Sequence, residues 1–143
     1  MARVEVPPPD PVLFTTEIPI RIGDLNYGNH LGNDAALALA HEARVRFLAE
    51  HSLGELDLDG IWMLIADAAV VYRAEGHWGM SLRAEIGAAE LRTRGCELLY
   101  RFSDAATGAE IFRVKTGLVF RDPATRKLVH VPERLARLLA PAG

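Results

Sequence analysis

The chain has 143 residues, of which 50% are hydrophobic, and a formal net charge of -3 at neutral pH. This length and composition are typical of one globular domain with a sizeable core, which excludes a disordered polypeptide. The mild acidity lacks the basic footprint of a nucleic-acid-binding domain, and the single cysteine excludes an intrachain disulfide and a cysteine metal cluster.

Residues 1–12 contain a cluster of prolines and no apolar signal-peptide core, so we expect an extended N-terminal leader before a domain spanning residues 13–143. The longest apolar run, residues 61–66, is too short to span a bilayer, which predicts no membrane segment. A lone cysteine fits a reducing compartment, and we expect a cytoplasmic protein.

Residues 13–22 alternate between apolar and polar side chains, which predicts a half-buried strand. Pro19 favours an edge position or a bulge for that strand, since proline cannot donate to a sheet ladder. Residues 23–32 are rich in glycine and asparagine and have no periodicity, which indicates a loop.

Residues 35–51 are rich in Ala, Leu, Arg and Glu and contain no Gly or Pro, which predicts a helix. Asn33 or Asp34 is the expected cap. Residues 61–72 form a nearly continuous apolar run that suits either a buried helix or a strand. We favour a central strand buried on both faces.

The rest of the chain repeats a strand-and-turn pattern that ends in a helix. The predicted strands are residues 81–91, 96–102 and 110–120 with a short one at 128–131, and the helix begins at Pro132 and ends near residue 140. One antiparallel sheet must therefore cover the long helix, which is an α+β fold. A second subunit would cover the remaining apolar strand face, so we expect a homodimer or a dimer of dimers.

The stretch with chemical potential is the polar, glycine-rich loop of residues 21–34, which leads into the long helix. The first turn of a helix offers unpaired N–H groups and a positive dipole end. Such groups can hold a thioester carbonyl and stabilise the oxyanion that forms when water attacks it.

This loop resembles the 4-hydroxybenzoyl-CoA thioesterase-like branch of the hotdog superfamily, whose members carry Asp-x-Asp-x-x-Gly-His-x-Asn-Asn before the helix and often Glu-x-Ala-Arg within it. The chain matches this pattern at Asp24, His30, Asn33 and the run Glu42-Ala43-Arg44. It departs at Asn26, Asn29 and Gly32, which replace Asp, Gly and Asn respectively.

The resemblance implies a hotdog fold, with an antiparallel sheet wrapped around a long central helix, and an acyl-CoA thioesterase that hydrolyses acyl-CoA or acyl-carrier thioesters. CoA would then be part of the substrate, and we expect no separate cofactor and no metal. In the branch, the carboxylate at the place of Asn26 acts as nucleophile or general base. An amide can do neither, so the base must come from another residue or hydrolysis is slow or absent.

Six residues are weighed for roles in the reaction, and two arginines for binding of the CoA phosphates. Glu42 is either the substitute base or an ion-pair partner of Arg46 one turn on. His30 is expected to shape the site more than to move a proton, and Asn33 to cap the helix.

Asn26 would orient water or bind the carbonyl. Asp24 is expected to brace the loop, and Asp67 is either a base or a buried hydrogen-bond partner, so the identity of the base stays open. Arg73 and Arg83 are candidates for the CoA phosphates.

Two other functions remain open. One is a hotdog hydratase or dehydratase acting on enoyl or hydroxyacyl thioesters, whose pattern Asp-x-Asn-Pro-x-His-x-Asp is evoked by Asp24, Asn26 and His30 without the proline. The other is a non-catalytic acyl-CoA binding protein, which the amide at Asn26 favours.

Overall fold

The computed structural model describes residues 3–140, and the strands and helices predicted from the sequence are all present. In chain order they are β1 (Phe14–Pro19), the short 3-10 helix η1 (Ile22–Asp24), α1 (Ala35–Glu50), β2 (Trp62–Tyr72), β3 (Ser81–Ala89), β4 (Gly95–Asp104), β5 (Glu110–Arg121), β6 (Leu128–Val129) and α2 (Glu133–Leu139).

The strands form one antiparallel sheet in the order β1-β3-β4-β5-β2, with β6 paired to β5. The register places Ile86, Tyr100 and Val114 side by side on β3, β4 and β5. All three are fully buried, so they mark the face that carries the core. Pro19 lies on β1, an edge strand, where a missing N–H is tolerated as predicted.

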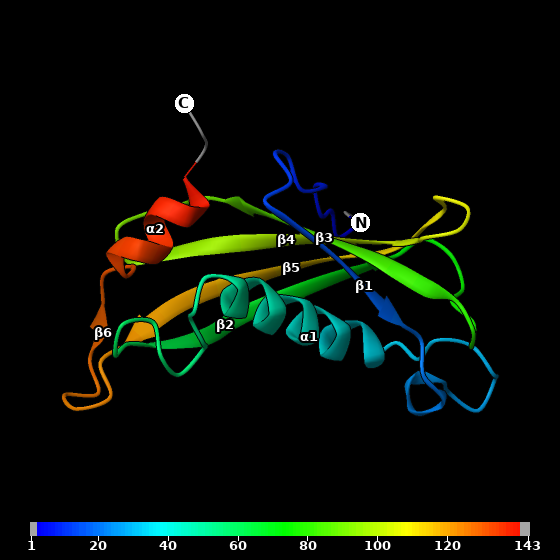
Figure 1. Ribbon diagram of the computed structural model, residues 1–143, viewed down its shortest axis with the longest axis horizontal. Helices are drawn as coiled ribbons and strands as arrows, with labels where there is room; N and C mark the ends of the chain where they lie inside the picture. The colour runs from blue at the N-terminus through cyan, green and yellow to red at the C-terminus, as the bar shows by residue number, and fades with distance from the viewer. Residues whose placement is uncertain (1–2, 141–143) are drawn as a thin grey trace.

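Helix α1 packs against the core face of the curved sheet (Figure 1), as the predicted hotdog architecture requires. Its buried residues recur every three or four positions, which is the spacing of one helix face. They include Ala36, Leu39, Ala40, Ala43 and Phe47. The three alanines are fully buried, and their small side chains let the helix approach the sheet closely.

Strand β2 corrects one prediction. Residues 61–72 do form a strand rather than a helix, but β2 lies at the edge of the sheet and pairs only with β5. Its middle, from Ile65 to Ala68, is exposed, and a bulge interrupts the register between Ile65 and Asp67. The middle of the apolar run is therefore not buried in the described part of the chain, because β2 has a neighbouring strand on one side.

The described part of the leader, residues 3–12, lies on the side of the sheet away from α1 (dark blue in Figure 1). Val6 is buried, and its carbonyl oxygen accepts a hydrogen bond of 3.0 Å from the Arg113 guanidinium of β5. Farther along, Gly87 leaves room for the chain, since a Cβ there would lie 2.8 Å from Pro9 Cβ. Neither helix in the described part of the chain is long and apolar enough to cross a bilayer.

Candidate functional site

Asp24 braces the start of the loop between β1 and α1. Its carboxylate accepts a hydrogen bond of 2.9 Å from the Arg21 backbone N–H and lies 3.7 Å from the Arg21 guanidinium. The Asp24 carbonyl in turn accepts the Gly32 N–H at 2.9 Å, which ties the two ends of the loop together. Asp24 therefore has the bracing role predicted for it.

Asn26 and His30 come together around Gly28. The Asn26 side-chain oxygen accepts the Gly28 N–H at 2.8 Å, and the Asn26 N–H donates to the His30 carbonyl at 2.9 Å. A Cβ added to Gly28 would lie 3.2 Å from Asn26 Oδ1 and 3.3 Å from His30 Nε2. Two of the predicted site residues thus flank one glycine that has no side chain to separate them.

Asn29 explains one departure from the family pattern. Its φ is 63°, which is left-handed backbone that glycine and asparagine tolerate better than other residues. The glycine found in the family at this place and the asparagine found here therefore support the same turn.

The start of α1 differs from the prediction, because Asn33 does not cap the helix. Asp34 occupies the cap position with helical backbone angles, and its side chain makes no capping hydrogen bond. The Asp34 carboxylate instead folds back over Gly32, where a Cβ would lie 2.7 Å from Asp34 Oδ1. The first turn of α1 is therefore not capped by the side chain of its own cap residue.

A cavity of about 260 Å³ adjoins this helix start. Its walls come from the end of the loop, from the residues after β2 and from the start of β5; they are His30, Leu31, Gly32, Asn33, Tyr72, Arg73, Ala74, Glu75, Ile111 and Phe112. The cavity therefore brings together His30, Asn33 and Arg73 of the predicted site residues, and it adds the carboxylate of Glu75.

Tyr72 joins β2 to the loop, since its hydroxyl donates a hydrogen bond of 2.8 Å to the Asn33 carbonyl. Partial burial and the negative charge of Asp34 raise the pKa of Tyr72, so the phenol stays a hydrogen-bond donor at neutral pH. The Tyr72 side chain is half exposed on the cavity wall.

Glu42 lies elsewhere on α1. It lines a separate cavity of about 140 Å³ together with Arg21 and Asp24, and its carboxylate accepts a hydrogen bond of 2.7 Å from Arg46. This is the ion pair that the spacing of four residues suggested. Arg46 also donates to the Glu17 carbonyl at 2.8 Å, so the pair fastens α1 to β1.

Arg83 and Asp67 also lie apart from the small cavity. Arg83 is on β3 opposite Glu17 and Ser103, and it does not line the cavity that contains Arg73. Asp67 is exposed on the edge strand β2, and its carboxylate lies over Gly117, where any side chain would collide with it. The expectation that Asp67 is buried in the folded chain was therefore wrong.

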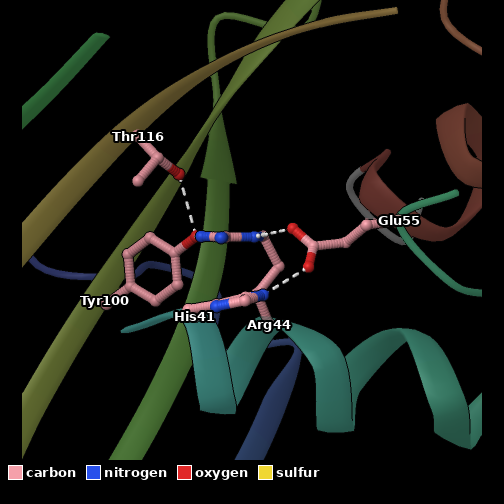
Figure 2. A network of polar contacts seen from close by, with 5 residues as sticks. All are labelled: His41, Arg44, Glu55, Tyr100 and Thr116. Carbon is pink, nitrogen blue, oxygen red and sulfur yellow. Dashed lines mark hydrogen bonds and ion pairs between the residues drawn. The ribbon is translucent and has the colours of Figure 1, made fainter. Parts of the chain in front are cut away.

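A second polar cluster crosses the core, and Figure 2 shows its five residues. Arg44 donates to Glu55 at 2.8 Å and to the Tyr100 hydroxyl at 3.0 Å, and that hydroxyl lies 2.8 Å from Thr116 Oγ1. His41 Nε2 lies 2.7 Å from the other Glu55 oxygen. Arg44, Tyr100 and Thr116 are buried and line none of the cavities described above, so we interpret this cluster as a brace between α1, the sheet and the loop after α1.

Two site residues were missed or undervalued by sequence reasoning. Asp34 was considered only as a cap, and its position over Gly32 depends on a side-chain rotamer that no pattern predicts. The sequence allowed Glu75 either to line the cleft or to be a solvated strand end, with the second favoured, and its place on the cavity wall arises from the pairing of β2 with β5. The sequence signal for both was their position next to the predicted loop or strand end.

Comparisons with known proteins agree on the fold. The sequence model of one family, described as the thioesterase-like superfamily, matches residues 20–139. No curated protein matches the chain significantly by sequence.

Among solved structures, the chain is similar to a thioesterase-superfamily protein from Jannaschia sp. CCS1, with 18% identity over 97% of this chain and 100% of that one and a TM-score of 0.83. It is also similar to a 1,4-dihydroxy-2-naphthoyl-CoA thioesterase from Synechocystis, with 19% identity over 88% and 94% of the two chains and a TM-score of 0.80. A 12:0-ACP thioesterase from Umbellularia californica has 15% identity over 90% of this chain and 54% of that one, with a TM-score of 0.74. At these identities the likeness shows the fold.

Proposed function

The chain belongs to the thioesterase-like superfamily, and from that premise we propose that it hydrolyses an acyl thioester whose carbonyl enters the 260 Å³ cavity. The observation that carries the proposal is the segment just before α1, where Gly32 and Asn33 line this cavity and the cap residue Asp34 makes no side-chain capping hydrogen bond. Unpaired N–H groups of a first helical turn are suited to hold a carbonyl oxygen and the oxyanion that develops from it.

The proposed division of labour follows from the residues in and beside the cavity. His30 lines the cavity, whereas Asn26 lies beside it across Gly28, and we expect the two to orient the carbonyl or the attacking water. Asn33 positions the backbone before the helix, and its carbonyl is held by Tyr72. Backbone and side-chain donors fixed in this way lose little freedom on binding, which favours the transition state.

The attacking water also needs a base, and Asn26 cannot serve as one. Glu42 was the candidate from the sequence, but it lines a different cavity and is engaged by Arg46. We therefore propose Glu75, the carboxylate on the wall that also contains His30. The Glu75 side chain is exposed, and its carboxylate lies 3.8 Å from His77 Nε2.

The experiment is the release of free thiol from a panel of acyl-CoA and acyl-pantetheine thioesters of increasing acyl length. Removing a general base costs on the order of a hundredfold in kcat, and we expect this loss for Glu75→Gln. Glu42→Gln is the matched control, with kcat near that of the unchanged protein. If no thioester releases free thiol, the proposal is rejected. If Glu42→Gln loses activity and Glu75→Gln does not, Glu42 is the general base instead of Glu75.

A non-catalytic acyl-thioester binding protein is the second candidate, because Asn26 stands where the family has a carboxylate. It predicts that a non-hydrolysable acyl-CoA analogue raises the melting temperature while no thiol is released from acyl-CoA.

We also propose that the protein acts as a homodimer joined through β2. Edge strands with exposed apolar side chains invite pairing with another chain, and Ile65 is 42% exposed in the middle of this edge. The cavity borders the end of the same strand, so a partner would lie beside the site.

A further inference from the structure

A larger cleft of about 660 Å³ borders the candidate site, and its walls include the leader. The two cavities share Tyr72 and Arg73. The remaining walls of the cleft are the leader residues from Arg3 to Pro7 on one side and Val71 and Arg113 on the other. A ligand with its reactive end in the small cavity would thus extend past Tyr72 into a cleft whose outer wall is the leader.

The leader is fastened to the sheet at two places. Arg113, itself held by two contacts to Glu110, donates to the Val6 carbonyl at 3.0 Å. Gly87 accommodates the backbone of the next segment, because a Cβ there would lie 2.8 Å from the Pro11 carbonyl oxygen. The wall of the cleft is therefore a seated segment with a buried valine rather than a loosely attached tail.

The cleft carries a surplus of positive charge. Arg3 and Arg73 line it, are exposed and form no ion pair with any residue that the structure describes. Arg113 is neutralised by Glu110, and Glu5 is the one acidic residue on the cleft walls. Two guanidinium groups without a carboxylate partner are suited to phosphate, which they bind through charge-assisted hydrogen bonds.

We propose that the leader and Arg73 form the binding site for the phosphorylated nucleotide end of a CoA thioester. This inference rests on the proposed function for the position of the acyl group. It makes CoA thioesters, rather than carrier-protein thioesters, the preferred substrates, because a carrier-bound pantetheine ends on a protein and has no nucleotide to place between Arg3 and Arg73. The fold comparison leaves this choice open, since thioesterases named for either kind of substrate share the fold.

The test compares one acyl group carried by CoA with the same acyl group carried by N-acetylcysteamine, which lacks the nucleotide. The variants are Arg3→Glu, Arg73→Glu and a chain without residues 1–7, which keeps the segment seated against Gly87. Arg94→Glu is the matched control, since Arg94 is exposed in the turn between β3 and β4, at the opposite end of the sheet. Melting temperatures establish that each variant is folded.

A charge-assisted hydrogen bond contributes about 1.5–3 kcal/mol, which corresponds to a loss of about tenfold or more in affinity. We therefore expect kcat/KM for the CoA thioester to fall at least tenfold in each cleft variant, through KM. For the N-acetylcysteamine thioester it should stay unchanged in Arg3→Glu and in the shortened chain, since these residues do not line the smaller cavity, whereas Arg73 lines both. Equal losses with both substrates in Arg3→Glu or the shortened chain, unchanged kinetics with CoA, or faster hydrolysis of an acyl-carrier thioester than of acyl-CoA would overturn the inference.

Titration calorimetry with free CoA separates this inference from the proposed hydrolysis. If the protein hydrolyses no thioester but binds CoA with a Kd that rises tenfold in Arg3→Glu, the nucleotide site stands and the proposed activity fails. If hydrolysis is observed and CoA binding is the same in all variants, the activity stands and the nucleotide site fails.

Discussion

The side chains of Asn26 and His30 both lie close to the position that a Cβ of residue 28 would occupy. A substitution of Gly28 therefore acts directly on both side chains. Gly28→Ala would place a methyl group 3.2 Å from Asn26 Oδ1 and 3.3 Å from His30 Nε2 and push both side chains outward. Misplacing groups in a site by a fraction of an ångström lowers rates, and we expect kcat to fall roughly tenfold with little change in stability.

Gly23→Ala is the control for this change. Gly23 lies in the same loop region, and a Cβ there meets nothing within 4 Å. Its kcat should match that of the unchanged protein, and equal losses in the two variants would show that the loop backbone, rather than the pair of side chains, is sensitive to alanine.

Cys96 illustrates how burial changes a titration. Desolvation, assisted by the charge of Glu97, raises the pKa of the thiol from 9.0 to about 12. Between these values the folded protein keeps a proton that the unfolded chain has released. The free energy of unfolding therefore falls as pH rises above about 9, by up to about 1.4 kcal/mol per pH unit for one such group.

Urea unfolding between pH 7 and pH 10.5 measures this fall, and Cys96→Val should make it less steep. Tyr100, whose pKa is raised mainly by burial, keeps part of the slope in that variant. An identical slope with and without the thiol would contradict the assignment. The same high pKa predicts that a disulfide reagent labels Cys96 slowly in the native state and rapidly in denaturant.

At the scale of elements, α1 is fastened to the sheet by the buried guanidinium of Arg44, which spans from Glu55 to Tyr100. Breaking a buried ion pair from one side leaves the remaining charge without its partner, and such changes cost about 3–5 kcal/mol. Glu55 is partly exposed and can be solvated by water when Arg44 is removed. We therefore expect Arg44→Met to lower the free energy of unfolding by about 3 kcal/mol, the lower end of this range.

Chemical unfolding checks this value against Arg137→Met, which removes an exposed pair within α2 and should cost less than about 0.5 kcal/mol. Similar losses in the two variants would show that the Arg44 cluster contributes no more than a surface pair.

The elements themselves were predictable because their signals are local. Alternation in residues 81–91 and the alanine-rich composition of residues 35–51 each depend on neighbours in sequence, and β3 and α1 appear where these patterns place them. The contact of Glu55 with Arg44 was not predictable, since it joins a loop to a helix through a fold that the local pattern does not describe.

The position of β2 was missed for a related reason. A central strand and an apolar edge strand can have the same composition. The sequence therefore does not show whether such a strand lies at the centre or at the edge of the sheet. The sequence predicted only the part of the candidate site that lies within the loop. Asn26 and His30 are close together in that loop, whereas Tyr72 at the end of β2 and Glu75 just after it reach the site through the pairing of strands in the sheet.

For the whole molecule, the exposed edge of β2 predicts a dimer in solution. Ile65→Lys places a charge in the middle of that edge, and charged residues there oppose strand pairing. Sedimentation should find the unchanged protein as a dimer and this variant as a monomer at micromolar concentration.

Thr15→Lys is the matched change on β1, the other edge strand, where Thr15 is also exposed. It should leave the dimer intact. A monomeric unchanged protein, or equal dissociation in both variants, would contradict a dimer joined through β2.

The loop between β1 and α1 owes its shape to main-chain hydrogen bonds, such as those from Asn26 to His30 and from Gly32 to Asp24. The side-chain oxygen of Asn26, which accepts the Gly28 N–H, is an oxygen that aspartate would present equally well. The architecture thus tolerates exchange between amide and carboxylate at this place. A single substitution at Asn26 would thus change the charge of the loop while leaving its main-chain framework in place.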